Sequence, residues 1–177
     1  MESFLELARI RRSYRKYTAQ PIEQKQIEQI LQAALMSPAS KRCNPWEFVV
    51  VTDHDVLSQM ASCRTYGSQM LNESQAGIIV CVDASLTDTW QCDGAIAAEH
   101  ILLEAADLGL GACWVQVYGR YADEQNTLSA EQQIRQLTGI PEHLNILCVI
   151  SLGHKNEERK PRELDKLQYE KVHYGNY

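Results

Sequence analysis

The chain has 177 residues, a length typical of one domain with a sizeable hydrophobic core. Hydrophobic residues make up 45% of the chain, charged residues make up 23%, and the formal net charge is −6, which disfavours general nucleic-acid binding. The N-terminus is acidic and amphipathic, and the longest apolar run, 94–110, contains charged residues, so we expect neither a signal peptide nor a membrane span.

In the first third of the chain, a capping box at Ser3 predicts a short helix over 3–9. A basic segment follows, and apolar residues at helical spacing then predict an amphipathic helix over 23–36. Residues 37–45 have the composition of a loop, and the run that starts at Trp46 and ends at Thr52 predicts a strand.

Helices and strands continue to alternate along the rest of the chain. The predicted elements are a helix capped by Asp53, a strand over 76–82, an apolar helix over 92–108, a strand over 112–117, a helix between Ser129 and Gly139, and a strand over 146–152. Residues 65–75 are polar and irregular. This alternation by itself is typical of a parallel, doubly wound sheet.

The tail from Gly153 onward has too few apolar residues for a core of its own, yet it carries several apolar and aromatic side chains. These are Tyr169, Val172, Tyr174 and Tyr177. An extended arm of this kind often docks on a partner, and a second copy of the chain is the simplest partner. We therefore expect a single domain over 1–177 whose tail, 155–177, reaches another subunit.

The basic segment near the N-terminus has polar side chains at alternate positions: Arg11, Ser13 and Arg15. In an extended segment, alternate side chains share one face, so two guanidinium groups and a hydroxyl could contact one ligand. Such a pair of cations suits an anionic, planar or phosphorylated molecule. A solvated basic patch is the simpler interpretation of this segment alone.

Two further polar clusters could bind a ligand of the same kind. The loop 38–46 offers a hydroxyl from Ser40, two cations and the Asn44 amide, immediately before a strand. Lys160 and Arg162 flank a proline, whose extended backbone lets both cations lie on one side. Taken alone, the loop is more simply interpreted as a plain helix-to-strand connection, and 160–162 as a solvated basic turn.

Several other kinds of chemistry have no motif in this sequence. We find no G-x-S-x-G elbow, no P-loop and no complete dinucleotide fingerprint. The five histidines lack metal-ligand spacing and the six cysteines form no C-x-x-C pair, so we expect no metal site. Three cysteines lie in apolar strand-like runs, which fits buried thiols in a reducing cytoplasm.

The three clusters, in this order, resemble the nitroreductase family of FMN-dependent oxidoreductases, from about Leu5 to Tyr177. The resemblance rests on RRSYRKY at 11–17, SPAS with NPWEF within 37–48, AA-x-LGLGACW at 105–114, and VHY at 172–174. It implies an α+β fold with a mixed, largely antiparallel central sheet flanked by helices. It also implies a homodimer with FMN at the interface and a C-terminal arm that embraces the partner.

The resemblance further implies a role for each cluster. Arg11, Lys160 and Arg162 would hold the FMN phosphate, Ser13 would bond near the ribityl chain or phosphate, and Arg15 would reach the pyrimidine end of the isoalloxazine. The other expected contacts are Arg12, the loop residues Pro38, Ala39, Ser40, Arg42 and Asn44 from the second subunit, and Trp114, Val115 and Gln116 along one ring face.

Two positions depart from the family pattern. Many relatives carry asparagine two positions before Asn44, where this chain has Arg42, and Asn44 itself replaces a more usual glutamine. A second cation near the ring would further stabilise negative charge on the reduced flavin, or would bind an acidic substrate.

The reaction implied is ping-pong hydride transfer, in which NAD(P)H reduces FMN and a small-molecule acceptor (a nitroaromatic, a quinone or a flavin) is reduced next. Three alternatives stay open. One is a specialised flavin reaction, such as reductive dehalogenation or flavin fragmentation, with 62–75 as the candidate lid. Another is a flavin-binding protein without enzymatic activity. The third is a cysteine-based enzyme that uses Cys43, whose thiol pKa neighbouring cations would lower.

Overall fold

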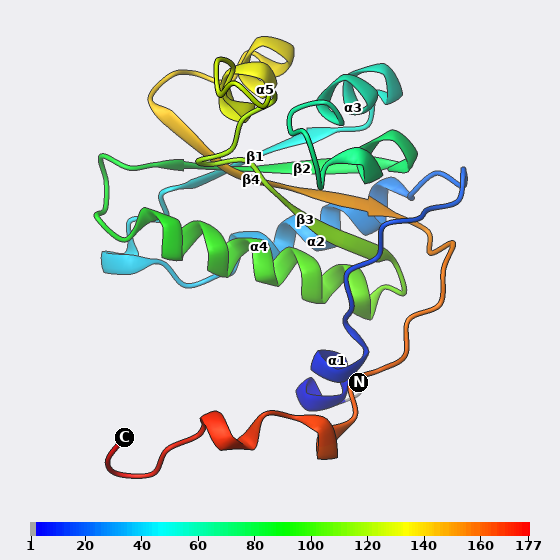
Figure 1. Ribbon diagram of the computed structural model, residues 1–177, viewed down its shortest axis with the longest axis vertical. Coiled ribbons are helices and arrows are strands. Elements are labelled where there is room, and N and C mark those ends of the chain that lie inside the picture. The colour runs from blue at the N-terminus through cyan, green and yellow to red at the C-terminus, as the bar shows by residue number, and fades with distance from the viewer. Residues whose placement is uncertain (1–2) are drawn as a thin grey trace.

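A computed structural model describes residues 3–177, in which a four-stranded sheet lies between two layers of helices (Figure 1). One face of the sheet is covered by α2 (Gln24–Leu35) and α4 (Trp90–Asp107). The other face is covered by α3 (His54–Met60) and α5 (Ala130–Thr138). The sheet is therefore buried on both sides.

The strands are β1 (Trp46–Val51), β2 (Ala76–Asp83), β3 (Gly111–Gln116) and β4 (Leu144–Gly153), and their order in the sheet is β1-β2-β4-β3. Every neighbouring pair is antiparallel. The predicted α+β fold with a largely antiparallel sheet is confirmed, and the parallel, doubly wound alternative is wrong. The alternation misleads because β4, the last strand, lies between β2 and β3, so the two strands that α4 joins are not neighbours.

The core consists of one apolar cluster on each face of the sheet. Side chains alternate between the faces along each strand, so Ile79 packs on the α3 and α5 side while Ile78 packs on the α2 and α4 side. Gly94 lets α4 approach the sheet closely, because a Cβ atom there would lie 2.7 Å from the Val82 side chain and 2.8 Å from that of Leu147. Helix α4 is thereby fixed against the sheet.

Most local elements match the sequence pattern. The first helix, α1 (Phe4–Ile10), begins where Ser3 Oγ accepts the Glu6 N–H at 3.2 Å, as the capping box predicts. Helix α4 begins at Trp90, earlier than the expected 92. The segment expected to be irregular, 65–75, contains a 3-10 turn whose apolar side chains are buried, because two hydrophobic residues there pack against the core although polar residues surround them.

The strand cysteines behave as small core residues. Cys81, Cys113 and Cys148 are buried, and burial raises the pKa of the Cys81 thiol to about 12. All six cysteines are free. Within residues 3–177, no helix is long and apolar enough to cross a bilayer, and no group of three or more His, Cys, Asp or Glu side chains could hold a metal ion.

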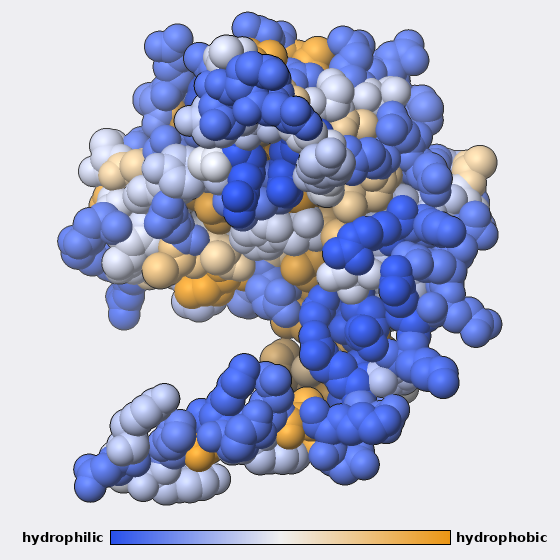
Figure 2. All heavy atoms as spheres, viewed as in Figure 1, coloured by the Kyte–Doolittle hydropathy of each residue, from blue (hydrophilic) through white to orange (hydrophobic). Residues whose placement is uncertain are grey.

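The tail leaves the body of the molecule after it has passed the N-terminal segment (Figure 1). It contains two short 3-10 turns, Leu164–Lys166 and Tyr169–Lys171, and its residues are exposed from 158 onward. Figure 2 shows a hollow between this arm and the body, with apolar patches on the body where it faces the hollow. In the part of the chain that the structure describes, the apolar and aromatic side chains of the arm are exposed, for example 38% at Leu167 and 92% at Tyr174.

Candidate functional site

The two basic segments, 11–15 and 160–162, lie side by side although they come from opposite ends of the chain. Arg162 donates its backbone N–H to the Arg9 carbonyl at 3.0 Å, and its own carbonyl accepts from Arg9 Nε at 3.2 Å. This reciprocal pair fixes the tail against the end of α1. The structure thus brings together two of the three clusters that the sequence singled out.

Consecutive arginines of the N-terminal segment face opposite ways, as an extended backbone requires. Arg11 directs its Nε toward Glu99 of α4, 3.6 Å from Oε1, whereas Arg12 donates through Nη1 to the Lys160 carbonyl of the tail. Glu99 gave no functional signal in the sequence, but it orients Arg11. Arg12, expected among the cofactor contacts, holds the backbone of the third cluster.

The next two predicted residues lie where the segment passes the sheet. Ser13 forms an isolated parallel bridge with Ala112 of β3. Arg15 donates its backbone N–H to Glu157 Oε1 at 2.7 Å, and Glu157 also pairs with Arg159 at 2.7 Å. Burial opposes ionisation of Glu157, but these bonds outweigh it and lower its pKa. Within residues 3–177, the Arg15 guanidinium has no carboxylate within 4.0 Å.

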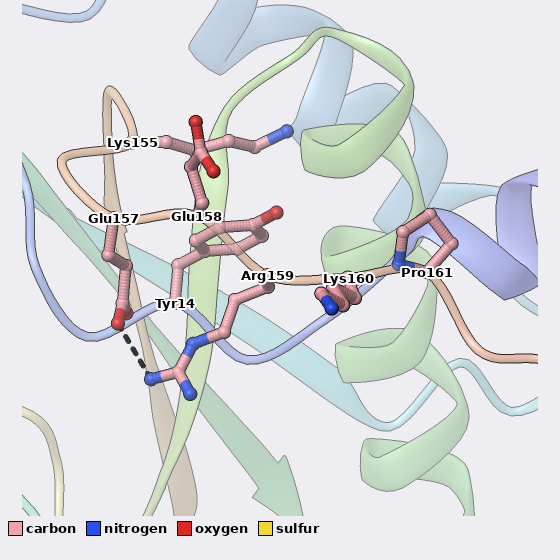
Figure 3. Close-up of a pocket in the computed structure, with 7 residues that line it drawn as sticks. All are labelled: Tyr14, Lys155, Glu157, Glu158, Arg159, Lys160 and Pro161. Carbon is pink, nitrogen blue, oxygen red and sulfur yellow. Dashed lines mark ion pairs between the residues drawn. The ribbon is translucent and has the colours of Figure 1, made fainter.

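A pocket of about 580 Å³ lies on the Tyr14 side of the N-terminal segment (Figure 3). The ring of Tyr14 lines it, with Lys155 Nζ 5.0 Å from the ring centroid. The Tyr17 hydroxyl donates to the Tyr14 carbonyl at 2.7 Å and lies 2.8 Å from Ser151 Oγ, so this part of the segment is anchored in the core. The pocket has mixed charge, because glutamates line it beside lysines and an arginine.

Beyond Ala112, the outer edge of β3 carries backbone groups that have no backbone partner within residues 3–177. Val117 donates across to β4 (3.1 Å to Leu147 O), whereas Ala112 accepts from Tyr14 on the opposite side at 3.0 Å. Since successive residues of a strand direct their backbone groups to opposite sides, Trp114 and Gln116 present theirs at the outer edge. In the part of the chain that the structure describes, neither residue forms a further backbone hydrogen bond there. Such an edge can bind a planar ligand with donors and acceptors on its rim.

The loop before β1 has an unusual backbone. Lys41, Arg42 and Asn44 all have positive φ values (52°, 56° and 43°), a conformation that residues other than glycine rarely adopt. Strain of this kind persists where surrounding contacts impose it, and it is concentrated at functional sites. The observation draws attention to the loop that contains the expected residues Pro38, Ala39, Ser40, Arg42 and Asn44.

Asp93 is the residue that holds this loop. It is 3% exposed, and its Oδ1 accepts the Ser40 N–H at 2.8 Å. Its Oδ2 accepts from Thr89 Oγ1 at 3.4 Å. Sequence patterns assign no role to Asp93; the available signal was an acid in the first turn of α4, directly before the apolar run 94–98. Cys43 donates its thiol to the Ser40 carbonyl at 2.9 Å, so in this structure the thiol is occupied within the loop.

One chain does not bring the loop and the basic segments together. The loop lies at the N-terminal end of α4, whereas α1 lies beneath the C-terminal half of that helix, next to the start of the arm (Figure 1). Asp93, which holds the loop, and Glu99, which pairs with Arg11, are six residues apart on α4, or about 9 Å along the helix axis at 1.5 Å per residue. Within residues 3–177, no hydrogen bond or ion pair joins the loop to either basic segment.

Comparison with known proteins gives a consistent result. The sequence profile described as "Nitroreductase family" matches residues 8–76 and 76–154. A relative from Archaeoglobus fulgidus, whose name combines NADH dehydrogenase with NAD(P)H nitroreductase, is 38% identical over 93% of this chain and 92% of its own length. The NADPH-flavin oxidoreductase of Vibrio harveyi is 30% identical over 92% of this chain and 70% of its own.

Solved structures match over nearly the whole chain. An FMN-dependent nitroreductase from Clostridium difficile R20291 superposes with a TM-score of 0.94 at 37% identity, covering 98% of this chain and all (100%) of that one. Nitroreductase A from Vibrio parahaemolyticus superposes with a TM-score of 0.77 at 30% identity, covering 100% of this chain and 77% of that one.

Proposed function

The chain belongs to the nitroreductase family, and we propose that it is an FMN-dependent oxidoreductase that takes hydride from NAD(P)H and reduces a small-molecule acceptor. The observation that carries the proposal is the pair of basic segments beside the free edge of β3. Nitroaromatics, quinones and free flavins are the acceptor classes we expect, and the names of the relatives support a nitro compound or a flavin.

The basic segments fit the phosphate end of FMN. We assign Arg11, Lys160 and Arg162 to the phosphate. Within residues 3–177, neither Lys160 nor Arg162 has a carboxylate within 4.0 Å, and the only such partner of Arg11 is half-exposed Glu99. These cations remain available for an anion, and we expect Ser13 to add a hydroxyl to the phosphate or the ribityl chain.

The edge of β3 fits the ring end of FMN. The backbone groups of Trp114 and Gln116 can bond the polar rim of the isoalloxazine, with Val115 between them. We also assign Arg15 to the ring, where its guanidinium would stabilise negative charge that accumulates on reduction. FMN, when bound, supplies the hydride-transfer chemistry, and this chain binds the cofactor, orients it and sets the electric field around it.

The rest of the site would come from a second subunit, in a homodimer. The arm exposes Leu164, Leu167, Tyr169 and Val172, and an apolar groove of about 390 Å³ between α2 and β1 is lined by residues that include Trp46 and Phe48. Apolar surfaces of this kind are typical of interfaces between subunits. The partner's loop would then cover the ring with Ser40, Arg42 and Asn44 and exclude water. The free cysteines fit a reducing compartment such as the cytoplasm.

An anaerobic titration tests this function. We expect purified protein to show a flavin spectrum that bleaches with NADH or NADPH and returns when a nitroaromatic, a quinone or riboflavin is added. A protein that holds FMN but is not bleached by either nicotinamide would instead be a flavin-binding protein. A protein that bleaches but returns only with a halogenated substrate would favour the dehalogenase alternative.

A further inference from the structure

A second basic hollow, outside the residues assigned to FMN, lies where two distant segments meet. It has a volume of about 150 Å³, and the residues that line it are Arg64, Thr65, Tyr66, Arg120 and Tyr121. One wall follows α3 and the other follows β3. Neither the phosphate contacts nor the ring contacts described above use these side chains.

The first wall is a tightly bonded turn. Gln69 accepts the Gly67 N–H at 2.8 Å through Oε1 and donates to the Thr65 carbonyl at 3.1 Å through Nε2. Gly67 has a φ of +88°, and a Cβ atom on it would lie 3.4 Å from Nη1 of Arg64, so the guanidinium rests against this glycine. The turn therefore holds Arg64 in place and presents Tyr66 to solvent.

The second wall is anchored to the sheet. Arg120 donates its N–H to the carbonyl of Val117, directly after β3, at 3.0 Å, and its own carbonyl accepts from Ala130 at 2.8 Å. Tyr121 forms an isolated bridge with Ser129. Arg120 is thus held close to the strand whose edge we assign to the flavin ring.

The chemistry of the hollow points to a planar anion. Within residues 3–177, neither Arg64 nor Arg120 has a carboxylate within 4.0 Å, although the chain carries a net charge of −6. The ring of Tyr66 is 75% exposed and that of Tyr121 is 43% exposed. Two free guanidinium groups with two aromatic faces suit a nucleoside phosphate, whose base stacks and whose phosphate accepts forked hydrogen bonds.

One wall of the hollow continues toward Arg15, which we assign to the flavin ring. The turn 64–67 also contributes Gly67 to a neighbouring hollow of about 400 Å³, which Arg15 lines. We propose that Arg64, Tyr66 and Arg120 bind the phosphate-bearing adenosine half of NAD(P)H while its nicotinamide lies over the flavin. This inference rests on the proposed function and adds to it a subsite for the reductant.

Equilibrium binding of NADP⁺ tests the subsite. We expect Arg64→Gln and Arg120→Gln each to weaken NADP⁺ binding about tenfold in calorimetry, because each loses a charge-assisted hydrogen bond. Tyr66→Ala should also weaken binding, whereas Tyr66→Phe should retain the stacking face and bind normally. Lys25→Gln, which removes an exposed charge on α2, is the matched control and should bind as the unaltered protein does.

Reduced nicotinamide mononucleotide, which lacks the adenosine half, separates this subsite from the ring site. Its affinity should be the same in all the variants, as should the FMN content. Unchanged NADP⁺ affinity in Arg64→Gln and Arg120→Gln would overturn the inference.

The inference would also be overturned if these variants lost the same affinity for the mononucleotide as for NADP⁺. A change in KM for an acidic acceptor such as 4-nitrobenzoate alone would likewise overturn it. Absence of FMN in the unaltered protein would instead count against the proposed function, because calorimetry with NADP⁺ does not depend on flavin colour.

Discussion

The basic segment at 11–15 and the loop at 38–44 are built in different ways. The segment is braced on every side by its own chain: α4 orients Arg11, the tail contacts Arg12, and the core holds Tyr14. The loop has a strained backbone that one buried carboxylate holds, and within residues 3–177 no hydrogen bond or ion pair joins it to either basic segment. In the site that we propose, one half is therefore pre-formed within a chain, whereas the other half would act only against a partner.

Removal of the arm should have the largest effect, because it would separate the loop at 38–44 from the site of the partner subunit. We expect a chain truncated after Arg162 to be monomeric and to bind FMN roughly a hundredfold more weakly, because the partner's loop no longer covers the ring. Light scattering and a flavin titration would measure both effects, and far-UV circular dichroism would check that the body remains folded. A dimer of full FMN affinity would show that the arm is dispensable.

Removal of a cationic side chain that we assign to the FMN phosphate tests the role of the basic segments. Arg11→Ala and Arg162→Ala should each weaken FMN binding about tenfold to a hundredfold, since each removes a charge-assisted contact to the phosphate. Riboflavin, which has no phosphate, should bind the variants and the unaltered protein equally. Equal FMN affinity would refute the phosphate assignment.

Arg15 should affect rate more than binding. We expect Arg15→Ala to keep most of its FMN but to be reduced by NAD(P)H about tenfold more slowly, because the guanidinium stabilises charge that develops on reduction. Stopped-flow spectroscopy gives this rate directly. Arg15→Lys, which keeps the charge, should recover most of it, and a rate for Arg15→Ala that matches the unaltered protein would contradict the role.

The smallest effect is expected from substitution of Asp93, which supports the strained loop. Asp93→Asn keeps an acceptor for the Ser40 N–H but loses the charge, so we expect a loss of about 1 kcal/mol in the free energy of unfolding and a few-fold weaker FMN binding. Asp93→Ala, which leaves that N–H unsatisfied, should cost about 1–3 kcal/mol. Chemical denaturation would measure both losses. If Asp93→Ala is as stable as the unaltered protein, Asp93 does not stabilise the loop.

Much of the fold follows from local patterns. The spacing of Ile27, Ile30 and Ala34 predicts α2, and the apolar runs predict all four strands. Strand order does not follow in this way, because the position of β4 between β2 and β3 depends on contacts between distant segments. The family resemblance, not periodicity, supplied the antiparallel sheet.

The site divides in the same manner. Alternation predicted that Arg11 and Arg12 face opposite sides, and the structure confirms it. The contact between Arg12 and the Lys160 carbonyl joins residues far apart in the chain and has no local signal. The positive φ values of Lys41 and Arg42 also have no signal, because neither residue type favours that conformation and contacts such as the Ser40–Asp93 bond constrain the loop.

The FMN stoichiometry of a mixed dimer tests the central claim most directly. One subunit would carry Arg11→Ala with Arg162→Ala, the other would carry Ser40→Ala with Asn44→Ala, and different affinity tags would allow the heterodimer to be purified. If each site uses the basic segments of one chain and the loop of the other, one site has both defects and the other has none. We then expect about half an FMN per chain, although each variant homodimer holds little. A heterodimer as poor in FMN as both homodimers would contradict the account.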